Sequence, residues 1–140
     1  MLLKHVTFEE PSSIASFESN VFRGCLSLKE ISIPSHVTSI DEYSLAECSL
    51  LERITFESPS SLYSIDCNAL FECSSLKQIA IHSSVKYIKD NAFNYCTSLT
   101  TLAFENPSYL ESIGEGAFTE CHSLSHIIFA YDSALTSIND

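Results

Sequence analysis

Five cysteines recur along the 140-residue chain at nearly constant intervals. Cys25, Cys48, Cys73, Cys96 and Cys121 are separated by 23, 25, 23 and 25 residues. A self-similar period in this range is typical of a solenoid, in which each copy forms one coil and neighbouring coils stack. Because a single coil cannot bury its apolar side alone, this period constrains the fold more strongly than any isolated motif does.

Apolar residues follow the same period. A leucine three residues after each cysteine opens the pattern LxxLxL, and a further copy precedes the first cysteine. A second apolar pair follows in every copy, as in Val37 and Ile40. The sequence therefore predicts a single domain over residues 1–140 with about six coils, the last one truncated, which start near Leu3, Leu28, Leu51, Leu76, Leu99 and Leu124.

The alternation between 23 and 25 residues has a visible origin. Copies one, three and five carry FEEPSSI, FESPSSL and FENPSYL, where copies two and four have IPSHV and IHSSV. The two extra residues belong in an outer turn, where they leave the strand register intact, and proline followed by serine is suited to a turn.

Two spacings within each copy predict two kinds of local structure. The central LxL has the period of two that is typical of a strand. Ala92, Phe93, Cys96 and Leu99 have the spacing of one apolar face of a short helix or 3-10 turn. We therefore predict an α/β solenoid with a parallel sheet on one face and short helical or 3-10 turns on the other.

The fuller repeat string carries a family resemblance. CSSLKQIAIHSSVKYIKDNAFNYC resembles the BspA-like class of leucine-rich repeats, in which CxxLxxIxIPxxVxxIxxxAFxxC recurs, and the resemblance covers nearly all of the chain. Ser44 and Val21 replace the alanine, Leu45 and Leu70 the phenylalanine, and His82 the proline, which are mostly small or apolar exchanges that a packed coil can absorb.

The resemblance implies a leucine-rich repeat solenoid and a role in recognition. Members of this class are typically surface or secreted recognition and adhesion molecules of bacteria and parasitic protists, and some bind host matrix proteins. A cell-surface or secreted location is therefore expected by resemblance, while a cytoplasmic location stays open. Because a fold does not fix a function, the adhesion role rests on analogy.

We expect the five periodic cysteines to form a ladder of buried thiols. The spacing places each sulfur inward, and a buried thiol behaves as a small hydrophobic group. Occasional disulfides between neighbouring coils are a second possibility and metal or catalytic use a third. Cys67 instead aligns with Ser19, Glu42, Asp90 and Glu115, so we expect it to be exposed or half exposed, as a tolerated substitution or as a site of oxidation.

Charge and motif content argue against several functions. Seven Lys and Arg against 18 Asp and Glu give a net charge of -11, which opposes binding to nucleic acid or to an anionic membrane. No apolar run approaches the roughly 20 residues of a membrane helix, and the first residues lack the apolar stretch of a secretory signal. The five histidines do not cluster, and no GxSxG, glycine-rich phosphate loop or HExxH is present. We expect no enzymatic activity, no metal and no cofactor.

The exposed positions of LxxLxL predict a binding surface for a protein ligand. They hold four of the seven basic residues in the first four coils and a neutral strip in the last two. The alternative interpretation is that this sheet face is merely soluble. The candidate residues are Lys4, His5, Lys29, Glu30, Glu52, Arg53, Lys77, Gln78, Thr100, Thr101, Ser125, His126 and Ile128.

The two ends of the repeat suggest a further alternative. The chain opens on a coil at Leu3 and stops after Ile138, with no polar capping repeat at either end. We expect either a fragment of a longer array or an end covered by another chain. A structural spacer, or a segment that self-associates end to end, is therefore the alternative to a protein-binding module.

Overall fold

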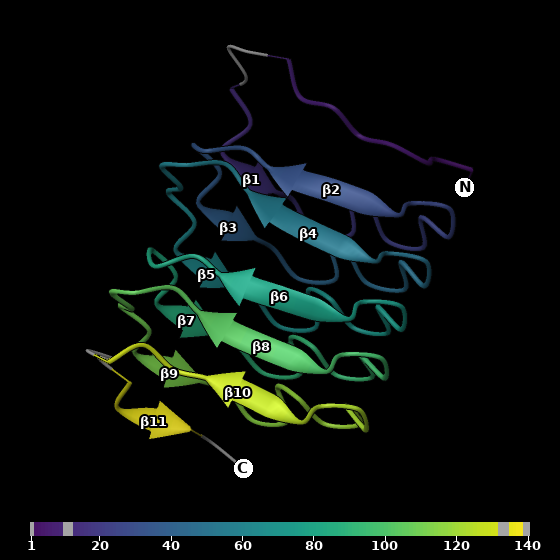
Figure 1. The fold of residues 1–140 in the computed structure, drawn as a ribbon. Helices are drawn as coiled ribbons and strands as arrows, with labels where there is room; N and C mark the ends of the chain where they lie inside the picture. The colour runs from purple at the N-terminus through teal and green to yellow at the C-terminus, as the bar shows by residue number, and fades with distance from the viewer. Residues whose placement is uncertain (1, 10–12, 132–134, 139–140) are drawn as a thin grey trace.

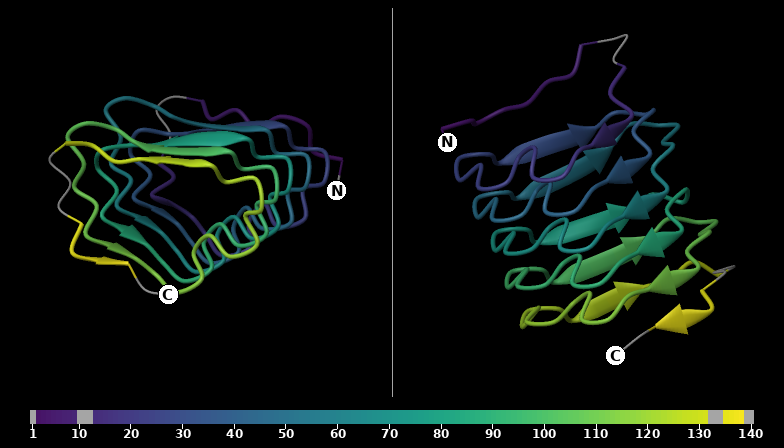
Figure 2. Two further views of the ribbon diagram at one scale, coloured as in Figure 1. Left: turned by 60° about the horizontal axis from the view of Figure 1, so that its bottom comes forward. Right: turned by 180° about the vertical axis from the view of Figure 1, so that it is seen from behind.

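The computed structural model describes residues 2–9, 13–131 and 135–138. Successive coils stack along one axis, with the N-terminal segment at one end of the stack and β11 at the other (Figure 1). Seen along that axis, each coil has three sides, two built from strands and one from turns (Figure 2). This stacking confirms the solenoid that the cysteine period predicts.

The LxxLxL segments form the longer strands, which pair in parallel. The pairing forms two separate sheets, a two-stranded sheet of β2 and β4 and a three-stranded sheet in the order β10-β8-β6. Within the described residues, no ladder joins β4 to β6. The predicted parallel sheet is thus present on this side in two parts, which consist of β2 (Glu30–Ile33), β4 (Arg53–Phe56), β6 (Gln78–Ile81), β8 (Thr101–Phe104) and β10 (His126–Ile128).

The second apolar pair of each coil forms another sheet, which is continuous. Its six strands pair in parallel in chain order, and each contributes an isoleucine or phenylalanine after a serine or tyrosine. The sequence predicts only an extended segment here. These strands are β1 (Ser16–Phe17), β3 (Ser39–Ile40), β5 (Ser64–Ile65), β7 (Tyr87–Ile88), β9 (Ser112–Ile113) and β11 (Ser137–Ile138).

The third side of the coil corrects the sequence prediction. We expected short helical or 3-10 turns, but no helix of either kind occurs in the described part of the chain. Two residues four positions apart in each of the first five coils have a left-handed φ, as Tyr43 (56°) and Glu47 (60°) do, and a right-handed helix cannot pass through them. The full set is Asn20, Gly24, Tyr43, Glu47, Asn68, Glu72, Asn91, Tyr95, Gly116 and Glu120.

The left-handed residues turn alternate N–H groups toward the next coil. In the second coil, the Ala46 N–H bonds within its own turn to the Tyr43 carbonyl at 3.2 Å. The N–H groups of Leu45 and Glu47 instead donate to Ala69 and Phe71 of the third coil, at 2.9 and 2.7 Å. A helix would use these donors internally, so the turns add lengthwise hydrogen bonds where a helix would add none.

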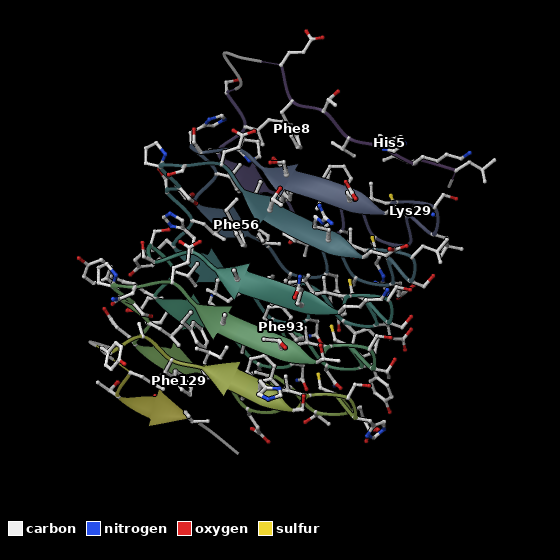
Figure 3. The ribbon with its side chains drawn as sticks, viewed as in Figure 1. His5, Phe8, Lys29, Phe56, Phe93 and Phe129 are labelled. Atoms are coloured by element: carbon white, nitrogen blue, oxygen red, sulfur yellow. The ribbon has the colours of Figure 1, made fainter. Side chains whose placement is uncertain are left out.

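The core lies inside the three sides and repeats from coil to coil. Leu28, Leu51, Leu76 and Leu99 are fully buried, and the cysteines and second-sheet isoleucines lie in neighbouring columns. Each buried leucine contributes about 1.5–3 kcal/mol relative to exposure. Phe93 lies near the middle of the stack (Figure 3), and its ring stacks on Phe118 of the next coil with ring centroids 5.4 Å apart.

Candidate functional site

The thirteen predicted binding residues lie on one side of the stack, over the longer strands. We call the surface formed by these thirteen residues the strand face. All are exposed except Thr101, which is half-buried. The alternation in LxxLxL explains this placement, because the leucine and isoleucine positions turn inward while the residues between them turn outward. The predicted exposure of the strand face is confirmed, while its use in binding stays a prediction.

The two separate sheets divide the strand face into two blocks. The first block places Glu30 opposite Arg53, and the Glu52 N–H donates to the Lys29 carbonyl at 2.8 Å. The second places Gln78 opposite Thr101 and Thr101 opposite His126. Lys4 and His5 lie on the N-terminal segment, which has no assigned strand, and Figure 3 shows His5 beyond β2 and Lys29 near its start.

Shallow grooves cross the strand face. One of about 380 Å³ lies between Lys4, Lys29 and Leu50, and another of about 360 Å³ lies beside His5, Glu30 and Arg53. A third, of about 320 Å³, follows the break between β4 and β6, and its lining includes Arg53, Thr55, Gln78, Ala80, Thr101 and Ala103. The strand face is therefore grooved, with apolar walls beside charged side chains.

The basic side chains divide into two groups by their partners. Arg23, Lys86 and Lys89 pair with Glu47, Glu111 and Asp66, at 2.6, 2.8 and 2.9 Å. The other four form no ion pair or side-chain hydrogen bond with any residue that the structure describes, and all four belong to the strand face. This second group is Lys4, Lys29, Arg53 and Lys77.

A polar cluster on the second sheet escaped the sequence analysis. Lys86 donates to Glu111 Oε1, and the Tyr87 hydroxyl donates to Glu111 Oε2 at 2.7 Å. The hydrogen bond to Lys86 lowers the pKa of Glu111, and the hydrogen bond to Glu111 raises the pKa of Tyr87. Tyr63 packs edge-on against Tyr87, with ring centroids 5.2 Å apart. Alignment of the copies would have shown that Lys86 and Glu111 share a coil position.

The cysteine ladder is structural. All six cysteines are free thiols, and Cys67 is half-buried, as the sequence predicts. The predicted burial is confirmed for Cys25, Cys48, Cys73 and Cys96, whereas Cys121 is only half-buried. The S–H groups of Cys48, Cys73, Cys96 and Cys121 donate to carbonyls of preceding coils, at 3.2, 3.2, 3.4 and 3.2 Å. Burial raises the pKa of Cys48 to about 12 and that of Cys121 to about 11, so these thiols stay protonated and unreactive.

The remaining titratable groups do not converge. Among the described residues, no group of three or more His, Cys, Asp or Glu side chains could hold a metal ion. His122 lies 2.8 Å from Glu120, and His82 lies 3.8 Å from Glu105, each as a separate pair. Residues 2–9, 13–131 and 135–138 also contain no helix of the length and apolarity that a membrane span requires.

Comparison with known proteins agrees with the fold. The family model described as BspA type leucine rich repeat region matches residues 2–100 and 55–140, with six copies. No curated protein matches the chain by sequence.

Three solved structures have the same fold. The leucine-rich repeat protein of T. pallidum is 31% identical, with a TM-score of 0.76 over 85% of this chain and 54% of that one. A leucine-rich cell surface protein from Faecalibacterium prausnitzii A2-165 is 30% identical, with a TM-score of 0.74 over 97% of this chain and 35% of that one.

A leucine-rich repeat protein from Bacteroides ovatus ATCC 8483 is 24% identical, with a TM-score of 0.56 over 93% of this chain and 38% of that one, and shows the fold alone. The present chain thus spans 54, 35 and 38% of the lengths of these three proteins.

Proposed function

Because the chain belongs to the BspA-type leucine-rich repeat family, we propose that it is a non-enzymatic protein-binding module that recognises a protein ligand through the strand face. The proposal includes a role in recognition or adhesion at a cell surface. The F. prausnitzii structure, which is described as a cell surface protein, supports this location by likeness.

One observation carries the proposal. The four cations without a partner in the described structure all lie on the strand face, while the other three form ion pairs elsewhere. A surface needed only for solubility gives no reason for this separation in a chain of net charge -11. Exposed charge beside shallow apolar grooves is typical of the rim and core of a protein interface.

Site-specific cross-linking tests the proposal. A benzoylphenylalanine in place of Gln78 lies on the strand face, and one in place of Tyr109 lies in an exposed loop as the matched control. With a mixture of surface proteins, we expect a saturable cross-linked product from position 78 and none from position 109. The purified partner should then bind the unmodified chain in calorimetry. Equal cross-linking from both positions, or from neither, would contradict a binding role for the strand face.

A further inference from the structure

The charge pattern of the strand face identifies the chemistry of a ligand. Resting on the proposed function, we infer that the strand face binds an extended, proline-rich acidic peptide segment, in which carboxylates recur at every third residue with an aliphatic side chain between them. The segment runs along the stacking axis. Its carboxylates lie over the second to fourth coils, and its aliphatic residue lies in the groove between β4 and β6.

The first step is the position of the cations. Lys29, Glu52 and Lys77 occupy one column of successive coils, so Lys29 and Lys77 lie two coils apart. Paired strands lie about 4.8 Å apart and the step from β4 to β6 has no ladder in the described residues, so the backbones of Lys29 and Lys77 are at least roughly 10 Å apart along the stack. Arg53 lies in the adjacent column, in the coil between them. The three cations therefore form a shallow triangle that faces solvent, with no carboxylate of the described structure paired to it.

The second step is the spacing that this triangle requires of a ligand. A polyproline II segment has three residues per turn and rises about 3.1 Å per residue, so every third side chain lies on the same face about 9 Å further on. Two coils are at least as long as this repeat, and the long flexible side chains of Lys29 and Lys77 can reach inward over the difference. Carboxylates at such positions reach Lys29 and Lys77 together, and the residues between them lie over Glu52.

The third step excludes a continuous polyanion. Glu52 lies between the two lysines, and Glu30 lies opposite Arg53 in the strand register. Double-stranded DNA carries a negative charge every 1.7 Å or so along its axis, and a charge line of that density would meet both glutamates. Like charges placed together at an interface oppose binding, so the two acids select spaced carboxylates over nucleic acid or a sulfated chain.

The fourth step concerns the aliphatic residue. The groove at the break between β4 and β6 holds about 320 Å³ and includes Arg53, Ala80 and Ala103 in its lining. Ala80 and Ala103 lie side by side in register and present methyl groups where long side chains would fill the groove. An aliphatic side chain between the two carboxylates lies over this break and can enter the groove while the carboxylates stay near Lys29 and Lys77.

Labelled synthetic peptides test the inference by fluorescence anisotropy. The probe is a proline-rich peptide with two glutamates separated by a leucine and a proline, and its control is the same composition with the glutamates adjacent. We expect the spaced peptide to bind at least about 10-fold more tightly than the adjacent one. Lys29→Gln and Lys77→Gln should each weaken binding by about 2- to 5-fold, as the loss of one exposed charge pair does.

Lys89→Gln is the matched control, because it removes the same charge from the second sheet and should leave peptide binding unchanged. Equal affinity for the two peptides, an equal loss in Lys89→Gln, or stronger binding of heparin than of the spaced peptide would overturn the inference. A further outcome would overturn this inference and leave the proposed function standing. If position 78 cross-links a protein that the spaced peptide does not displace, the strand face binds proteins but not this class of segment.

Discussion

Replacing Cys73 with alanine should destabilise the protein more than the same change at Cys96. Both thiols are fully buried, and both donate to a carbonyl of the preceding coil. The Leu70 carbonyl that accepts from Cys96 also accepts the Cys73 N–H at 3.2 Å. The Leu45 carbonyl has only the Cys73 thiol among the partners that the described structure gives it. Only the Cys73 variant therefore leaves a buried acceptor without a donor.

The magnitude follows from two contributions. Loss of a buried sulfur costs each variant about 1–2 kcal/mol in transfer and cavity terms. An unsatisfied buried carbonyl adds about 1–3 kcal/mol to Cys73→Ala alone. With a urea m-value of about 2 kcal/mol/M, the denaturation midpoint should fall by roughly 0.5–1 M for Cys96→Ala and by 1–2.5 M for Cys73→Ala. Equal midpoint shifts, at equal m-values, would refute the thiol as a structural hydrogen-bond donor.

Three further predictions concern other parts of the coil. Cys67 and Cys121 are both half-buried, but burial raises the pKa of Cys121 to about 11, so Cys67 should react first with a thiol reagent in the native state. Cys67→Ser should remove that first phase, while the four buried thiols react only in urea. Tyr87 should ionise above the ordinary value of 10.0, so its contribution to stability is present below that pH and is lost above it. In Glu111→Gln, the phenolate absorbance should appear at lower pH. Gly114→Ala should destabilise by about 1–3 kcal/mol or more in thermal unfolding, because a Cβ there would lie 2.5 Å from the Asp90 amide nitrogen. An unchanged melting temperature would contradict this close approach.

The apolar columns could be predicted from sequence because coil stacking repeats them at a fixed interval. The turns could not, because an apolar face at i, i+1, i+4 and i+7 is common to a helix and to two consecutive turns. A signal was nevertheless present. Asn68 and Asn91, like Gly24 and Gly116, occupy the positions of left-handed φ, and these residue types tolerate that conformation best.

The candidate site could likewise be predicted only in part from the sequence. Strand alternation was enough to predict the exposure of the strand-face side chains, with Thr101, which is half-buried, as the exception. The break between β4 and β6 is a property of pairing between coils, and no residue pattern within a coil encodes it. The ion pairs that neutralise three of the basic residues also depend on contacts between coils. Thus the exposure of Lys29 and Lys77 could be predicted, but not that they have no ion-pair partner among the residues that the structure describes.

The hydrogen bonds between turns of successive coils have a consequence for curvature. A solenoid with helices about 10 Å wide on one side and strands about 4.8 Å apart on the other must bend toward its strands. Here the turns of neighbouring coils are joined directly, as where the Leu70 N–H donates to the Ala92 carbonyl at 2.8 Å, so no helix width forces the turn side to advance further per coil than the strand side. The stack therefore runs straight, as Figure 1 shows. The strand face is therefore straight rather than concave, and a ligand gains contact area by extending along the stack rather than by being wide.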